Sequence, residues 1–146
     1  MARYSVGGRS TGAGSSTLPL FSLYGGASGA GKIREIGVFN TTAVALAISL
    51  QRFTATGTQG AALTEIGYEP DTPVSNCQGF NTHTVTPTIT AGVIRQASIG
   101  AAIGAGVIWT FGDTGLIVKL GTGNGYGILI PAGTGQIVDF YIDWDE

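Results

Sequence analysis

The sequence predicts an all-β fold, a single-domain antiparallel β-sandwich of jelly-roll-like form. Apolar and polar residues alternate in several short runs, which is typical of strands with one buried face. Turns rich in glycine separate these runs, and glycine supplies 25 of the 146 residues, well above a typical share of about 7%. No run of ten or more residues carries the 3.6-residue apolar period of a helix. Such a pattern favours a sandwich or barrel.

The first residues predict an arm rather than core. The stretch ARYSVGGRSTGAGSST is rich in glycine, serine and threonine and has no apolar period, as linkers do. We therefore expect a flexible N-terminal arm over residues 1–17 and one β-sandwich domain over residues 18–146. The next segment, Leu18–Tyr24, is apolar and contains Pro19. Because proline removes a ladder donor, this segment is predicted to be an edge strand.

The clearest alternation lies in Ile33–Asn40 and Val44–Phe53. A short turn-forming connection, Asn40-Thr41-Thr42, separates the two runs, so they are predicted to pair as a hairpin. The pattern then weakens over Thr54–Val85. A loop of that length in a small domain is usually functional, disordered or packed against a partner.

The rest of the chain predicts six further strands. In the last of them one face carries the apolar side chains of Val138, Phe140, Ile142 and Trp144. The other face carries Asp139, Tyr141 and Asp143, which indicates a half-buried antiparallel strand. The predicted runs are Pro87–Ala91, Val93–Gly100, Gly106–Phe111, Gly115–Leu120, Tyr126–Pro131 and Gln136–Trp144.

Composition excludes several classes of partner. Only 11% of the residues are charged and the net charge is -2, so no cationic stripe for direct nucleic-acid binding is expected. The apolar runs are too short to cross a membrane. The opening MARYSVGG lacks a secretion signal, and the single Cys77 makes no internal disulfide. We therefore expect synthesis in a cytoplasm.

The stretch Gly26-Ala27-Ser28-Gly29-Ala30-Gly31-Lys32 fits the phosphate-binding pattern GxxxxGK. A phosphate cradle needs a following helix and a Ser or Thr after the lysine, which binds magnesium. Here Ile33 follows Lys32, and the next run has the period of a strand. The stretch is therefore interpreted as a loop before a strand.

Three further constellations are weighed against structural roles. His83 is the only histidine, and with Ser75 and Cys77 it could form a nucleophilic site or supply metal ligands, but no family signature surrounds these residues. The carboxylates Asp139, Asp143, Asp145 and Glu146 could bind calcium or act in glycoside hydrolysis, yet a solvated strand face explains them better. Asn40-Thr41-Thr42 is also a glycosylation sequon.

The aromatic side chains Trp109, Phe111, Phe140, Tyr141 and Trp144 could stack on a sugar. Core packing accounts better for Phe140 and Trp144, and Tyr141 is left open. We predict no catalytic, cofactor-binding or metal-binding residue, no cofactor, and no enzyme activity.

Three segments carry a resemblance: GVFNTTAVALAISLQRFTATGTQGAALTE, FNTHTVTPTITAGVIRQASIGAAIGAGVIWTFG and GILIPAGTGQIVDFYIDWDE. Their texture and order resemble small structural proteins of tailed bacteriophages, especially head decoration or cement proteins. The resemblance implies a β-sandwich or jelly-roll fold and a homo-oligomer, most simply a homotrimer. It further implies binding to the major capsid protein on the outer surface of the virion capsid, after synthesis in the host cytoplasm.

Two rival functions remain open at this point. A phage fibre or receptor-binding module would bind a host glycan through residues 54–85 and Tyr141. A hydrolase ranks last, because the single histidine and sparse carboxylates form no set of nucleophile, base and orienting group.

Overall fold

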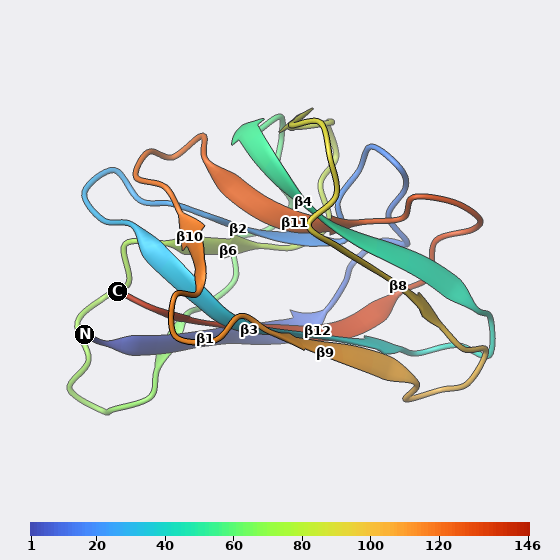
Figure 1. Cartoon of the computed structure of the whole chain (residues 1–146), viewed down its shortest axis with the longest axis horizontal. Helices are drawn as coiled ribbons and strands as arrows, with labels where there is room; N and C mark the ends of the chain where they lie inside the picture. The colour runs from blue at the N-terminus through green and yellow to red at the C-terminus, as the bar shows by residue number, and fades with distance from the viewer.

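The computed structural model describes residues 1–146, which form strands and no helix. Two six-stranded antiparallel sheets lie face to face as a β-sandwich (Figure 1), which confirms the prediction of an all-β antiparallel sandwich. Sheet A contains β1 (Arg3–Arg9), β3 (Gly31–Asn40), β5 (Ile66–Gly67), β9 (Gly106–Thr110), β10 (Leu116–Val118) and β12 (Val138–Asp145). Sheet B contains β2 (Phe21–Tyr24), β4 (Leu46–Ala55), β6 (Gln78–Phe80), β7 (Thr88–Ile89), β8 (Arg95–Ile99) and β11 (Gly125–Leu129). A helix long and apolar enough to span a bilayer is absent.

The main core fills the space between the sheets. The alternation of β12 is confirmed, because Val138, Phe140, Ile142 and Trp144 are all at most 4% exposed. The ring of Phe140 stacks on that of Phe21 across the two sheets, with centroids 4.0 Å apart. Burial of such apolar area is the main favourable term in folding.

A second, smaller core lies on the outer face of sheet B. Tyr24, Phe53 and Leu129 form it. Leu23 and Ile128, the strand neighbours of Tyr24 and Leu129, point into the main core, so Tyr24 and Leu129 point the opposite way. Phe53 shares their face, because Gly125 pairs with both Phe53 and Tyr24. Phe80, which belongs to the predicted 54–85 excursion, packs against them. The excursion therefore belongs to the sandwich itself, since it supplies β5 to sheet A and β6 to sheet B.

Residues 1–17 do not form the predicted arm. Strand β1 pairs with β12 along its whole length and also with β5, and Tyr4 and Val6 are 3% and 2% exposed. Beyond the strand, the amide of Ile130 donates to Ser15 O. The prediction of an arm, and of a domain that starts at residue 18, is wrong because only two apolar side chains mark this strand. Its partner β12 supplies the pairing.

Two pairing predictions are also wrong. Strand β2 is not an edge strand, because it lies between β6 and β11, and Pro19 precedes it. Strands β3 and β4 form as predicted but belong to different sheets. The connection crosses between the sheets because the buried Asn40 side chain donates to Val44 O and to Gly100 O. A two-stranded hairpin turn would leave this amide without those partners.

Candidate functional site

The glycines of the GxxxxGK stretch allow close packing. A loop precedes β3, and Lys32 lies on that strand opposite Ile117 and Asp145. A Cβ on Gly26 would lie 2.2 Å from Asn76 O, so the loop passes Asn76 too closely for a side chain. No helix follows the loop, so the dipole and free amides that hold a phosphate are missing.

His83 packs beside the Tyr24 and Phe53 rings of the second core and contacts a serine that the sequence did not single out. Its Nε2 is 2.8 Å from Ser22 Oγ. Burial lowers the pKa of His83 to about 4, and the backbone at Val85 and Thr56 only partly opposes this shift. Ser22 is fully buried, and Nδ1 of His83 has no hydrogen-bond partner. A nucleophile and base need access to substrate and an orienting group, so this pair is a structural one.

Ser75 and Cys77 contact Glu146 rather than His83. Ser75 Oγ donates to Glu146 Oε1, and the backbone amide of Cys77 donates to the same oxygen. Cys77 is 1% exposed, and burial raises the pKa of its thiol to about 12. A buried neutral thiol is a poor nucleophile. The three candidates of the sequence analysis therefore do not assemble.

Each of the four C-terminal carboxylates has its own structural partner. Asp139 pairs with Arg9, Asp143 accepts from Tyr68 Oη at 2.8 Å, and Asp145 pairs with two arginines. Burial alone would raise the pKa of Glu146, but hydrogen bonds from Ser75, Asn76, Cys77 and Trp144 outweigh it and lower that pKa to about 2. No group of three or more His, Cys, Asp or Glu side chains is placed to hold a metal ion.

The aromatic candidates separate as the alternation of β12 predicts. Phe140 and Trp144 are core residues, whereas Tyr141 is half-buried on the outer face of sheet A. The Tyr141 ring lies over Gly37, where a Cβ would be 2.2 Å from Cε1, and its hydroxyl donates to Glu35. A ring placed over a strand glycine covers the bare backbone there. The sequon residue Asn40 is 1% exposed and sheltered from modification in this fold.

The most distinctive surface is the end of the sandwich opposite the chain termini, on the right of Figure 1. We call it the uncharged end. Four loops form it, residues 10–18, 40–45, 100–105 and 131–137, and none of them contains a charged residue. Three large apolar side chains are exposed on it: Val44 at 48%, Ile103 at 76% and Ile137 at 39%.

Hydrogen bonds and close contacts join the four loops to one another. Asn40 Nδ2 donates to Val44 O and Gly100 O, which joins two of them. Thr42 Oγ1 donates to Gln136 Oε1 at 2.8 Å, which adds the third. A Cβ on Gly135 would lie 1.9 Å from Ala13 O, so the fourth loop passes directly beside the third. The apolar side chains are thus presented by a connected surface.

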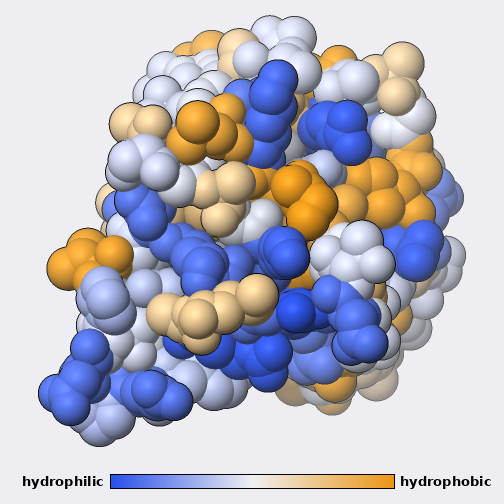
Figure 2. Space-filling view, turned by 60° about the vertical axis from the view of Figure 1, so that its left-hand side comes forward, coloured by the Kyte–Doolittle hydropathy of each residue, from blue (hydrophilic) through white to orange (hydrophobic).

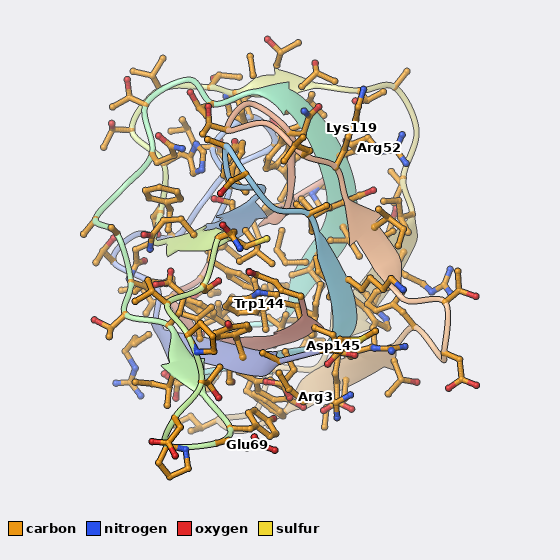
Figure 3. All side chains as sticks on the ribbon, turned by 90° about the vertical axis from the view of Figure 1, so that its left-hand side faces the viewer. Arg3, Arg52, Glu69, Lys119, Trp144 and Asp145 are labelled. Atoms are coloured by element: carbon orange, nitrogen blue, oxygen red, sulfur yellow. The ribbon has the colours of Figure 1, made fainter.

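The opposite end carries most of the charge, and we call it the charged end. Figure 2 shows a broad region of hydrophilic side chains there, and Figure 3 places Arg3, Arg52, Glu69, Lys119 and Asp145 at this end. The Asp145 side chain is 6% exposed and bonds Arg3 Nε at 2.8 Å and Arg34 Nε at 2.5 Å. The hydrogen bond from Arg3, followed by that from Arg34, holds the pKa of Asp145 below its usual value against the opposing effect of burial.

Comparison with known proteins adds no relative: no family model, no curated protein and no solved structure matches the chain. The candidate site therefore rests on geometry alone. Sequence reasoning missed the uncharged end because charge-free stretches also occur elsewhere in the chain, for example over residues 72–94. The charge-free surface can be recognised only in the structure, where the sheet topology brings the four loops together.

Proposed function

We propose that this chain is a virion structural protein, a decoration or cement protein that binds the outer surface of a bacteriophage head and stabilises it. The uncharged end is the observation that carries the proposal. It is the surface through which the protein attaches to shell protein and to further copies of itself, and the charged end faces the solution.

The chemistry of the uncharged end favours lasting contact with protein. Burial of a charge in an interface costs free energy unless the charge is paired, and the core of an interface is accordingly depleted in charged residues. Burial of Ile103 and Val44 removes apolar surface from water at no such cost. The bonds of Asn40 and Thr42 already order the loops, so association loses little conformational entropy.

The identity of the partner follows from the resemblance described above. It supports the major capsid protein as the partner and a homotrimer as the oligomer. The chain crosses between the two sheets at most of its connections, from β1 through β6 in strict alternation, which supports the jelly-roll version of the sandwich. A single β-sandwich domain with only 11% charged residues also suits a protein that works within an assembly, because few charges have to be paired or desolvated when its surface is buried.

The test compares two exposed apolar residues at opposite ends. Ile103→Asp changes the uncharged end. Val74→Asp changes the charged end: Val74 is 94% exposed, and the preceding residue, Pro73, accepts a hydrogen bond from Tyr4 Oη in β1. Both variants should keep the wild-type melting temperature, because neither side chain is buried. Particles of the encoding phage that lack the protein are mixed with each form and sedimented.

We expect wild type and Val74→Asp to sediment with the particles, and Ile103→Asp to bind at least about tenfold more weakly, a change of about 1.4 kcal/mol. Equal occupancy by both variants would overturn the proposed attachment surface. Failure of the wild type to bind any particle, together with binding to a glycan array, would favour the receptor-binding function instead.

A further inference from the structure

A cavity of about 420 Å³ opens at the charged end, between the two sheets. Strand β4 contributes Arg52 and Thr54, β11 contributes Gly125 and Tyr126, and β10 with the loop after it contributes Ile117, Lys119 and Asn124. This volume lies within the range of about 300 to 1,000 Å³ that small-molecule sites usually have.

Two of the lining residues are basic and neither forms an ion pair. The chain has seven basic residues and nine acidic ones, and its three ion pairs use Arg3, Arg9 and Arg34. No Asp, Glu or His lines the cavity. Arg52 and Lys119 therefore give it two positive charges without a counter-charge from the protein, in a chain that is negative overall.

Contacts with Tyr126 orient the Arg52 guanidinium. The two residues are cross-strand partners of β4 and β11. Arg52 Nε donates to Tyr126 Oη at 3.2 Å, and that hydroxyl donates to Ile117 O at 3.0 Å. The guanidinium carbon lies 5.6 Å from the ring centroid, within the range of a cation–π contact.

These bonds leave both terminal nitrogens of Arg52 without a protein acceptor. Lys119 lines the same cavity, and both side chains lie in the upper part of Figure 3. The Thr54 hydroxyl, which has no side-chain partner, adds a donor on the same wall. A guanidinium fork with an ammonium beside it matches the oxygens of a carboxylate or phosphate group.

We propose that this cavity is a binding site for an oxyanion, the carboxylate or phosphate group of a small ligand. The terminal nitrogens of Arg52 bind two of its oxygens and Lys119 neutralises the remaining charge. The Tyr126 ring forms the apolar floor. This site is at the charged end, and its existence does not depend on the proposed attachment through the uncharged end.

The experiment is an amide NMR titration of the ¹⁵N-labelled chain with inorganic phosphate and, separately, with acetate, at constant ionic strength. We expect saturable shifts at Arg52, Lys119, Gly125 and Tyr126, with millimolar dissociation constants of about 1 to 10 mM, as a few charged hydrogen bonds to a small ion allow. Tighter binding of phosphate assigns a phosphate-bearing ligand, and tighter binding of acetate assigns a carboxylate.

The variant Arg52→Gln/Lys119→Gln should bind either ion at least about tenfold more weakly, which is about 1.4 kcal/mol. Lys32→Gln and Arg95→Gln are matched controls, because Lys32 and Arg95 also form no ion pair and lie outside the cavity. They should bind like the wild type. Unchanged signals outside the cavity report that the double variant is folded.

Shifts that rise linearly without saturation in the wild type would overturn the proposal. An equal weakening in either control would also overturn it, because the effect would then be one of overall charge. The outcome is separable from the attachment test, since Ile103→Asp should leave the titration unchanged.

Discussion

At the charged end of the sandwich buried ionised groups hold the chain together, whereas at the uncharged end neutral side chains, chiefly Asn40, join the loops, and the neighbouring Arg9–Asp139 ion pair is exposed. Asp145 bonds two arginines, and Glu146 accepts five hydrogen bonds from Ser75, Asn76, Cys77 and Trp144. At the other end Asn40 bonds Val44, Gly100 and Thr42.

The difference suggests a division of roles between the ends. An end rich in charge remains hydrated and resists association, because a buried charge needs a partner. The four loops of the uncharged end carry no charge, and the neighbouring Arg9 and Asp139 are paired with each other, so another protein can bury this end at little electrostatic cost. We therefore expect that substitutions at the charged end change mainly the free energy of unfolding, and that substitutions at the uncharged end also change attachment.

Deletion of residues 2–9 should have the largest effect. It removes β1 from between β12 and β5, together with Tyr4, Val6 and Arg3, the partner of Asp145. Two core side chains alone are worth several kcal/mol, against a total stability of about 5 to 15 kcal/mol. We expect no cooperative thermal transition by circular dichroism. A cooperative melt would show that the sandwich does not need this strand.

Asp145→Asn should cost about 3 kcal/mol, because two arginines lose their buried counter-charge. The loss should appear in urea denaturation as a lower midpoint with an unchanged slope. Lys32→Gln, at the same end but without an ion pair, is the control. A variant as stable as the wild type would mean that the charged end is not held by this cluster.

Asn40→Ala should cost about 2 kcal/mol, since it leaves the carbonyls of Val44 and Gly100 and the amide of Thr42 without partners. It should also weaken attachment to particles, because the loops that present Ile103 lose their connection. Thr41→Ala, which removes one exposed bond to Ile137 O, is a milder control. Full attachment by the Asn40 variant would separate loop order from binding.

Acid should loosen the charged end more than the uncharged end, where Asp139, whose pKa is lowered by its hydrogen bond from Arg9, lies in an exposed pair. The pKa values of Asp145 and Glu146 are lowered in the fold, that of Glu146 to about 2. Their contribution to stability is therefore complete above the usual values of 3.8 and 4.5 and is lost as the pH falls toward 2. After correction for the pH dependence of the intrinsic exchange rate, the amide hydrogen-exchange rate at residues 68–77 should rise about tenfold. This rise corresponds to a fall of about 1.4 kcal/mol in the free energy of local opening.

Exchange at residues 40–45 should change little over the same range, because no carboxylate lies among their partners. A uniform rise over both ends would indicate global acid unfolding instead, and the two ends would not then be independent.

Asp139→Asn should have the smallest effect. Its ion pair with Arg9 has good geometry, at 2.7 Å, but both side chains are about half exposed or more, at 48% and 65%. Exposed pairs of this kind contribute about 0 to 1 kcal/mol. The urea midpoint should fall by less than that of Asp145→Asn. An equal loss would mean that ion-pair burial does not govern the strength of the pairs in this protein.

The alternation of residue types determined a large part of the fold by itself. It assigned the buried face of β12 correctly and located β3, β4 and the strands from β7 onward, because a strand with one wet face must alternate whatever its neighbours are. The same alternation excluded a helix after Lys32, which removed the phosphate-binding hypothesis before the structure did.

Only the tertiary structure decided which strands pair and which loops meet. A period-two pattern names the buried face of a strand but not its partner, so β3 and β4 could not be assigned to different sheets, and β1 could not be recognised with two apolar side chains. The contacts of His83 with Ser22, of Glu146 with residues 75–77 and of the four uncharged loops join positions far apart in the chain. Such contacts depend on the packing of two whole sheets, which no local pattern of residues records.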